Sequence, residues 1–296
     1  MKILLLGKNG QVGWELQRSL APLGELIALG SDQADLTELD GLAAIVRDVA
    51  PDVIVNAAAH TAVDKAESEP DLVNTINALA PSVLANEARR LNALLIHYST
   101  DYVFDGSGDK PWTETDTTNP LSAYGASKLE GEQLIQQSGC RHLIFRTSWV
   151  YGARGGNFAK TMLRLAQERD SMKVINDQFG APTGADLLAD VTAHAIRTAL
   201  VNPDVAGLYH LVASGETSWH GYANFVIESA RRAGVPIKVA SDAIEAVPTS
   251  AFPTPARRPH NSRLNTIKLT RAFDLSLPHW QIGVERMLTE VLESGK

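Results

Sequence analysis

Tyr124 and Lys128 are the residues of this chain whose types and spacing are best suited to chemistry. Residues four apart lie on one face of a helix, because an α-helix has about 3.6 residues per turn, so the phenol and the amine can meet. A nearby ammonium group favours the ionised form of a phenol, whose free pKa is near ~10. The pair predicts a general acid or base for interconverting a hydroxyl and a carbonyl group. The alternative is an ordinary helix face, with a core tyrosine and a solvated lysine.

A glycine-rich turn near the start of the chain predicts where a nucleotide would bind. Residues 3–6 are apolar, as in a buried parallel strand, and residues 14–20 suggest a helix. The spacing between them is G-x-x-G-x-x-G. Glycines at such a turn permit close approach of a pyrophosphate, which the helix N-terminus attracts. The cofactor-binding candidates of this turn, for which a plain glycine turn is the alternative, are Gly7, Gly10, Gln11, Val12 and Gly13.

Short apolar runs then alternate with helical patterns, which predicts an α/β fold with a Rossmann-like, doubly wound parallel sheet. The predicted strands are 25–29, 52–56, 94–98 and 142–147, and the predicted helices between them are 39–49, 63–90 and the one that carries Tyr124. Ligands of such sheets bind at the carboxyl ends of the strands. Thr100 follows the strand at 94–98, so its hydroxyl group could donate to a substrate carbonyl.

The end of the second strand bears on the choice of cofactor. Sites that prefer NAD commonly place Asp or Glu there to bind the ribose 2′-hydroxyl, whereas Gly30 and Ser31 stand there in this chain. A 2′-phosphate would not be repelled, although Asp32 is close and no arginine stands beside it. The sequence therefore favours NADPH and leaves NADH open, with Ser31, Asp35 and Leu36 as cofactor neighbours. Asp35 could equally cap the next helix.

Small and polar candidates for cofactor binding follow the third strand, namely Ala58, Ala59, His60 and Thr61. Asn56 and Thr61 could hydrogen-bond the ribose or a phosphate, and local capping of the loop is the alternative. Asn77, within the predicted helix 63–90, could serve a water or proton network or could face solvent.

The composition limits the partners and the compartment. Hydrophobic residues make up 44% and charged residues 21% of 296 residues, as in a globular enzyme with room for two lobes. A net charge of −7 gives no basic face for nucleic acid. The single cysteine, Cys140, allows neither an intramolecular disulfide nor a cysteine metal cluster. The N-terminal apolar run is too short for a membrane span, so we expect a cytoplasmic protein without a membrane partner.

The pattern becomes less regular beyond residue 150. We predict a dinucleotide-binding domain at 1–150, with returning segments near 174–212 that rejoin the sheet. Residues 151–173 and 213–296 are predicted to form mostly a smaller C-terminal α/β lobe that binds the substrate. A cleft between two lobes is a natural place for a ligand.

The ordered set of glycine turn, Asn56-Ala57-Ala58, Thr100 and Tyr124-x-x-x-Lys128 resembles the extended short-chain dehydrogenase/reductases. Longer stretches resemble the dTDP-4-dehydrorhamnose reductase family among them, at residues 7–16, 97–104, 146–151, 177–183 and 258–264. This resemblance spans nearly the whole chain. It implies reduction of the C4 keto group of dTDP-4-dehydro-6-deoxy-L-mannose to dTDP-L-rhamnose with NADPH or NADH, the last step of dTDP-rhamnose synthesis.

The resemblance also implies roles for single residues. Tyr124 would protonate the nascent C4 alkoxide, Lys128 would lower the pKa of the phenol and hold the nicotinamide ribose, and Thr100 would hydrogen-bond the reacting oxygen. The implied substrate-binding residues are Thr100, Asp101, Tyr102, Trp149, Arg257 and Arg258. The two arginines are candidates for the dTDP pyrophosphate, and a solvated basic pair is the alternative.

Some members of the resembled family are homodimers with Mg²⁺ at the interface. The candidate ligands here are Glu15, Asp186 and Glu290. Asp186 stands where a close relative would have Glu, and its shorter side chain reaches less far. Glu15 is also explained by the helix dipole, which favours an acidic residue in a first helical turn.

Three rival functions stay open. Sugar 4,6-dehydratases typically have Asp-Glu after the threonine, whereas this chain has Asp101 and Tyr102. Another nucleotide-sugar epimerase or reductase could use the same three residues, but an epimerase returns the hydride to the sugar. A non-catalytic cofactor-binding regulator, like the regulatory subunit of methionine adenosyltransferase, also resembles these reductases. The intact set of Thr100, Tyr124 and Lys128 argues against it.

Overall fold

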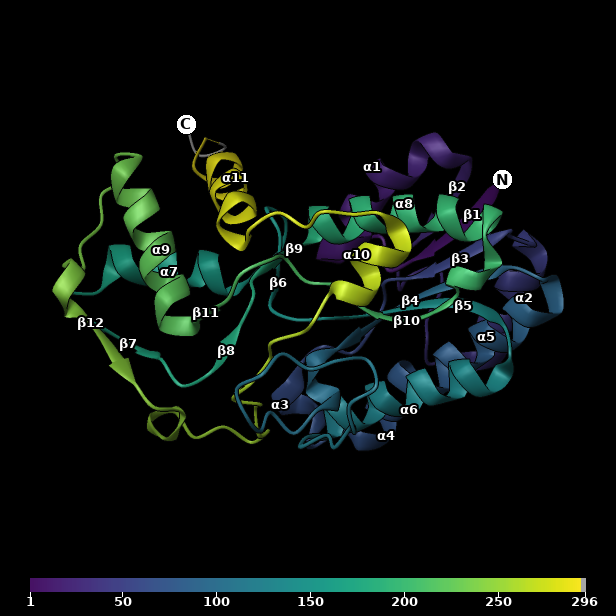
Figure 1. Cartoon of the computed structure of the whole chain (residues 1–296), viewed down its shortest axis with the longest axis horizontal. Helices are drawn as coiled ribbons and strands as arrows, with labels where there is room; N and C mark the ends of the chain where they lie inside the picture. Colours follow the sequence, from purple (N-terminus) through teal and green to yellow (C-terminus); the bar gives the residue numbers. More distant parts are fainter. Residues whose placement is uncertain (294–296) are drawn as a thin grey trace.

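A six-stranded sheet forms the centre of the computed structural model, which describes residues 1–293 (Figure 1). The strands are β1 (Lys2–Leu6), β2 (Glu25–Leu29), β3 (Val53–Asn56), β4 (Leu94–Thr100), β5 (Arg141–Thr147) and β10 (Gly207–His210). All of them run parallel, in the order β10-β5-β4-β3-β1-β2. The predicted Rossmann-like, doubly wound fold is confirmed. The chain changes direction across the sheet between β1 and β3, where such folds bind ligands.

Both faces of this sheet are buried, which explains the continuous apolar runs of its strands. Ile3 and Leu5 of β1 belong to one core, and Leu4 and Leu6 to the other, because successive side chains of a strand point to opposite faces. The helices that contribute to the first core are α1 (Gln11–Leu20), α8 (Ala185–Val201) and α10 (Ile267–Phe273). The second core includes α2 (Leu39–Val49), α5 (Ala80–Leu91) and α6 (Ala123–Ser138).

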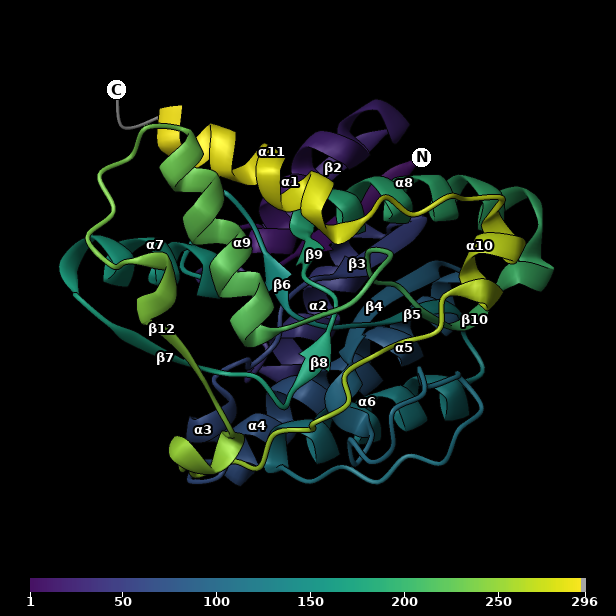
Figure 2. The ribbon, with the colours of Figure 1, turned by 60° about the vertical axis from the view of Figure 1, so that its left-hand side comes forward.

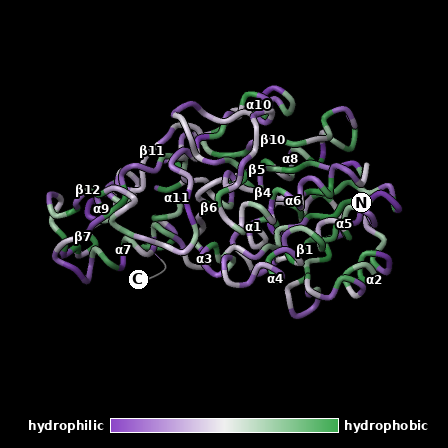
Figure 3. Tube along the Cα trace, turned by 90° about the horizontal axis from the view of Figure 1, so that it is seen from below, coloured by the Kyte–Doolittle hydropathy of each residue, from purple (hydrophilic) through white to green (hydrophobic). Residues whose placement is uncertain are grey.

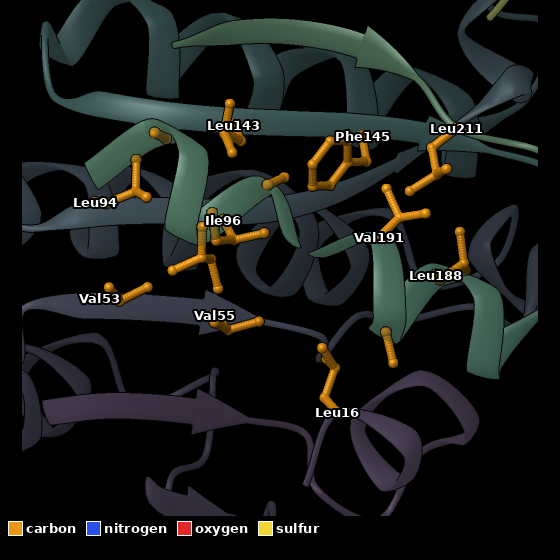
Figure 4. Close-up of a cluster of buried hydrophobic side chains, with 14 of the residues drawn as sticks. Leu16, Val53, Val55, Leu94, Ile96, Leu143, Phe145, Leu188, Val191 and Leu211 are labelled. Atoms are coloured by element: carbon orange, nitrogen blue, oxygen red, sulfur yellow. The ribbon is translucent and has the colours of Figure 1, made fainter. Parts of the chain in front are cut away.

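The first core shows how firmly the strands are held. Leu16 of α1 and Leu188 of α8 point toward the strand residues Val55 and Phe145 (Figure 4), and all four are fully buried. Hydrophobic stretches of the chain run through this interior (Figure 3). Truncating such a leucine to alanine typically costs about 2–5 kcal/mol of stability. The ends of β1, β3, β4 and β5 are therefore fixed relative to one another.

The stretch predicted as one helix from 63 to 90 is divided. It forms α3 (Val63–Ala66), α4 (Pro70–Asn74), the π-helical turn η2 (Thr75–Leu79) and α5. Pro70 is the first residue of α4, where the missing N–H is tolerated but the preceding helix cannot run on. The π turn places Asn77 inside, fully buried, where its side chain bonds the N–H (2.9 Å) and the carbonyl (3.1 Å) of His60. Asn77 is therefore not solvated.

A smaller lobe lies at one end of the sheet (Figure 2). Its strands are β6 (Val150–Tyr151), β7 (Met172–Ile175), β8 (Phe179–Gly180), β9 (Thr183–Gly184), β11 (Thr217–Ser218) and β12 (Ile244–Val247). They pair in twos, β6 with β9, β7 with β12 and β8 with β11. The helices α7 (Phe158–Glu168), α9 (Trp219–Arg232) and α11 (Trp280–Glu293) enclose a separate core that includes Tyr222 and Trp280. Short 3-10 turns complete the chain at η1 (Ala21–Leu23), η3 (Asp101–Val103), η4 (Pro203–Val205), η5 (Ser241–Ala243) and η6 (Thr249–Ala251).

The pairing of the strands shows which parts of the predicted returning segment, residues 174–212, rejoin the large sheet. Helix α8 and strand β10 lie with the large sheet, whereas β7 pairs with β12 in the smaller lobe. Helix α10 also packs on the large sheet, although it falls within 213–296. The division into a dinucleotide-binding and a substrate-binding part stays a prediction. No helix in residues 1–293 has the length and hydropathy needed to span a membrane.

Candidate active site

A pocket of about 650 Å³ opens where the strands of the large sheet end. This volume is typical of small-molecule sites, which commonly measure ~300–1,000 Å³. The predicted site residues that line it are Gly7, Gly10, Gln11, Val12, Ser31, Asp35, Leu36, Ala58, Ala59, Thr61, Thr100, Asp101, Tyr102, Tyr124, Lys128 and Trp149. The predicted cofactor- and substrate-binding residues that do not line it are Gly13, Asn56, His60, Arg257 and Arg258, and the predicted metal ligands Glu15, Asp186 and Glu290 also lie elsewhere.

The turn between β1 and α1 needs glycine at two positions, Gly7 and Gly13, for different reasons. Gly7 has a φ of 85°, and a Cβ there would come within 2.7 Å of the Ala58 nitrogen. A Cβ on Gly13 would lie 2.0 Å from the Gly7 carbonyl oxygen, so Gly13 serves close packing of the helix on the turn. Gly10 precedes α1 without a side-chain cap, and Gln11 and Val12 follow it in the pocket wall. Unpaired N–H groups at a helix N-terminus favour an anion.

Lys8 lies at the end of β2, a contact that the sequence reasoning missed. The backbone N–H groups of Gly7 and Lys8 both donate to the Leu29 carbonyl, at 3.0 and 3.2 Å. The Lys8 amine then reaches past Gly30 to donate to Gln33 Oε1 at 2.5 Å. A lysine thus stands beside the strand end, where the sequence had shown only that no arginine is next to Asp32.

The loop after β3 is held by contacts of its own. Asn56 Oδ1 accepts from the Ala58 N–H at 3.2 Å, and Asn56 Nδ2 lies 3.2 Å from His97 Nδ1. Asn56 is therefore a local cap and does not face the pocket, which corrects one of our two expectations for it. The His60 ring turns toward Glu69, with Nε2 3.7 Å from Oε2, and it does not line the pocket, so its role in cofactor binding stays a prediction.

Several lining residues carried no signal of their own in the sequence. They are Asn9, Gly30, Ala34, Ala57, Val63, Ile76, Tyr98, Ser99, Thr147, Ser148 and Val150. Most of them are neighbours of predicted residues at strand ends. Ile76 belongs to the π turn, whose position no periodicity indicates.

Thr100 and Tyr124 meet because α6 packs closely on the turn that follows β4. Ser122 caps α6 by accepting from the Gly125 N–H at 3.2 Å. A Cβ on Gly125 would come within 2.3 Å of the Tyr102 carbonyl oxygen, so only glycine allows this approach. The Tyr124 ring packs edge-on against Tyr102, with centroids 5.6 Å apart.

Burial dominates the electrostatics of these groups. It raises the pKa of Tyr124 to about 12, while a hydrogen bond with Thr100 lowers this pKa and the charge of Asp101 raises it. Burial also raises the pKa of Asp101 to about 6, against hydrogen bonds from Ser262 and Thr100 that lower it. The Tyr124 phenol is therefore protonated at neutral pH.

The hydrogen bonds of the Lys128 amine go to groups other than the Tyr124 phenol, which we expected the amine to influence. Its Nζ donates to the Tyr98 carbonyl at 2.6 Å and lies 3.1 Å from His97 Nε2. Burial lowers the pKa of Lys128 to about 8, and Glu132 raises it. The expected lowering of the Tyr124 pKa by a lysine ammonium group is not met in this structure.

Arg258 reaches the edge of the site indirectly. Its guanidinium forms an ion pair with Asp64, at 2.8 Å, and a hydrogen bond to Thr254 at 2.6 Å. It also hydrogen-bonds Tyr102, which lines the pocket. Arg257 is exposed.

A family model described as RmlD substrate binding domain matches residues 1–293. The dTDP-4-dehydrorhamnose reductase of Escherichia coli (strain K12) is 62% identical over 295 residues, which is 98% of either chain. The chain belongs to the dTDP-4-dehydrorhamnose reductase family.

Solved structures of this reductase family share the fold. One, from Clostridium acetobutylicum, has a TM-score of 0.88 at 36% identity and covers 99% of this chain and 100% of that one. Another, from Bacillus anthracis and in complex with NADP, has a TM-score of 0.87 at 33% identity and covers 98% of this chain and 99% of that one.

The acidic residues expected to bind Mg²⁺ in this reductase family lie around one small cavity, but with an arginine among them. Arg286 nitrogen atoms are 3.6 Å from Asp186 and 3.5 Å from Glu290. Burial raises the pKa of Glu15, Arg18 lowers it, and the charges of the other two carboxylates raise it. Within residues 1–293, no three or more His, Cys, Asp or Glu side chains are grouped to hold a metal ion. The residues do not fit the expected Mg²⁺ site.

Proposed function

We propose that this protein reduces the C4 keto group of dTDP-4-dehydro-6-deoxy-L-mannose to give dTDP-L-rhamnose, with NADPH as the preferred reductant. The observation that carries this proposal is that Thr100, Tyr124 and Lys128 all line the pocket that the glycine turn also lines. This chain, which has all three residues, is 62% identical to the Escherichia coli reductase over 98% of its length.

The strand ends suit a dinucleotide, whose nicotinamide would supply the hydride when bound. The uncapped N-terminus of α1 offers N–H groups to a pyrophosphate, and Gly7 and Gly10 let it come close. Lys8 and Ser31 stand at the end of β2, where an adenosine 2′-phosphate would lie. A cation there stabilises the phosphate of NADPH and does nothing for NADH, which supports the preference for NADPH.

Tyr124 would give its proton to the oxygen at C4. Its raised pKa keeps the phenol protonated before the reaction, and an alkoxide is a stronger base than a phenolate, so the transfer is downhill. Thr100, already in hydrogen-bonding contact with Tyr124, would fix the same oxygen. Thr100 is buried and Tyr124 is partly buried, which limits the access of competing water.

The sugar nucleotide would be held by the far wall of the pocket. Asp101, Tyr102 and Trp149 supply polar and aromatic groups there. Trp149 is fixed by stacking on Trp219, with ring centroids 3.6 Å apart. Arg258 is our candidate for the diphosphate and would exchange part of its ion pair with Asp64 for it. Arg257 would assist from the exposed side.

A stoichiometric assay tests this function. The purified protein, dTDP-4-dehydro-L-rhamnose and NADPH should give one equivalent of oxidised cofactor, followed at 340 nm, per dTDP-L-rhamnose formed. Turnover of the sugar without cofactor oxidation would instead identify an epimerase. Tight NADPH binding without any sugar conversion would point to a regulatory protein.

The expected homodimer, the cytoplasmic location and the absence of nucleic-acid and membrane partners stay predictions. Light scattering during size-exclusion chromatography tests the predicted homodimer. We propose no role for Mg²⁺, because Arg286 already compensates the carboxylates that would bind it.

A further inference from the structure

Trp149 has a backbone conformation that its surroundings must maintain. Its φ is 49°, in the left-handed region, where a bulky residue other than glycine is a rare exception. Such a residue keeps this conformation only when the structure around it holds it there. Trp149 lines the pocket shortly after the end of β5, and its carbonyl accepts a hydrogen bond from the Thr183 N–H at 3.2 Å. This bond holds the backbone, but it does not set the direction of the indole ring.

The indole of Trp149 is held by a second indole, that of Trp219, which stands outside the pocket wall. The two rings are stacked, with an interplanar angle of 16° and centroids 3.6 Å apart. Trp219 is itself fixed, because its Nε1 donates to Gln178 Oε1 at 3.0 Å and Phe158 packs on it with centroids 4.5 Å apart. Gln178 is 3% exposed and donates in turn to Thr249 Oγ1 at 3.0 Å. The stack is therefore anchored in the smaller lobe.

The pairing of β11 with β8 brings the two indoles to the same place. Trp219 is the first residue of α9, directly after β11 (Figure 1). Thr217 of β11 is the partner of Gly180 of β8. A Cβ on Gly180 would come within 2.9 Å of the Trp149 ring, so the glycine leaves room for this indole. The Trp149 ring is thus confined by Gly180 as well as by Trp219.

We propose that Trp219 is a positioning residue of the sugar-nucleotide site, which acts by holding the Trp149 indole in the pocket wall, an inference that rests on the proposed function for the identity of the ligand. Without the stack, the backbone of Trp149 can relax and its side chain can change rotamer. Binding the sugar nucleotide must then also order this side chain, which costs affinity. A stacked aromatic pair contributes enough to change the affinity roughly 2- to 10-fold.

Binding of dTDP-L-rhamnose tests this inference without turnover. Calorimetry is done on the full-length protein with saturating NADPH, because the product and the reduced cofactor cannot react with each other. Trp219→Leu should weaken the binding of dTDP-L-rhamnose roughly 2- to 10-fold, raise KM for the keto sugar by a similar factor and leave kcat nearly unchanged. Trp219→Phe, which keeps a ring to stack, should restore most of the affinity. The affinity for NADPH should stay at the wild-type value in both variants.

Trp280→Leu is the matched control. Trp280 belongs to the same core and is 4% exposed, but its ring packs on Tyr222 and Phe225, with centroids 5.8 and 4.9 Å away. This variant should keep the wild-type affinity for dTDP-L-rhamnose. Circular dichroism adds a spectroscopic signature, because stacked indoles couple their electronic transitions. The resulting exciton couplet should disappear in Trp219→Leu and remain in Trp280→Leu.

A double-mutant cycle decides whether Trp219 acts through Trp149. The double variant Trp149→Leu with Trp219→Leu should bind dTDP-L-rhamnose no more weakly than Trp149→Leu alone, since Trp219 then has no indole left to position. Additive losses would overturn the inference. It would also be overturned by wild-type affinity or a retained couplet in folded Trp219→Leu, or by an equal loss in Trp280→Leu.

Two further outcomes are separated by the same samples. If Trp219→Leu does not fold, Trp219→Met takes its place in the cycle, because an unbranched side chain fills an irregular space more easily. A wild-type protein that binds dTDP-L-rhamnose but does not reduce the keto sugar would refute the proposed function, and the binding data would still decide the role of Trp219. A wild-type protein that does not bind dTDP-L-rhamnose would refute both.

Discussion

Replacing Lys8 by methionine should weaken the preference for NADPH. Methionine keeps most of the length of the side chain, and the backbone bonds of the glycine turn to Leu29 are retained. Only the amine beside Gly30 and Gln33 is lost. Because NADH has no 2′-phosphate, its kinetics should hardly change.

The size of the expected change in cofactor preference follows from the surroundings of the Lys8 amine. An ideal charge pair at 4 Å near a protein surface would give about 4 kcal/mol. The Lys8–Gln33 bond is exposed to solvent and Asp32 lies beside the same glycine, so screening and a competing carboxylate reduce this value. We expect about 1–2 kcal/mol, which is roughly a 5- to 30-fold fall in the kcat/KM ratio of NADPH to NADH.

The assay is initial-rate kinetics at 340 nm with each cofactor and saturating sugar, at low and at moderate salt. Lys2→Met is the control, since it removes the same charge from the other end of β1, where the Lys2 amine bonds the Val49 carbonyl at 3.1 Å. The control should keep the wild-type ratio. A Lys8→Met ratio within twofold of wild type would show that the 2′-phosphate lies elsewhere.

Three further outcomes are expected. Tyr124→Phe should bind NADPH normally but lose roughly 10²–10⁴ in kcat, the usual contribution of a positioned general acid, and near-normal turnover at saturating sugar would refute this role. Ser31→Asp should shift the kcat/KM ratio toward NADH, because the new carboxylate repels a 2′-phosphate and accepts from a 2′-hydroxyl; an unchanged ratio would exclude the end of β2 as the discriminator. The raised pKa of Asp101, about 6 against 3.8, gives stability that is fully present below pH 3.8 and is lost as the pH rises through 6. Between pH 4 and pH 8, urea titrations should therefore show the wild type losing about 2 kcal/mol more than Asp101→Asn, and equal losses would contradict the shift.

The fold could be predicted because its signals are local. Each strand of the large sheet is a short apolar run, buried on both faces except in the partly buried edge strand β2, and each is followed by a helix or by a turn. Residues at strand ends must share one edge of a parallel sheet, so Gly7, Ser31, Ala58 and Thr100 could be grouped without coordinates.

The contacts that tune the site could not be predicted, because they depend on register and on backbone approach. Lys128 meets His97 across 31 positions, and only the pairing of β3 with β4 brings Asn56 to the same ring. Lys8 reaches the end of β2 because two backbone N–H groups fix the turn on Leu29. The resemblance to a family supplied the substrate, which no spacing in the chain specifies.

The smaller lobe has a consequence for how the protein is made. Its core joins Tyr151, Tyr222 and Trp280 from distant parts of the chain, and α11 closes it. A ribosome releases the chain from its N-terminus, so the large sheet can assemble up to β10 while this core still lacks its last helix. The part of α9 that α11 covers then stays open until α11 has emerged. Nascent chains that stall before α11 should accordingly be the species that chaperones and proteases capture.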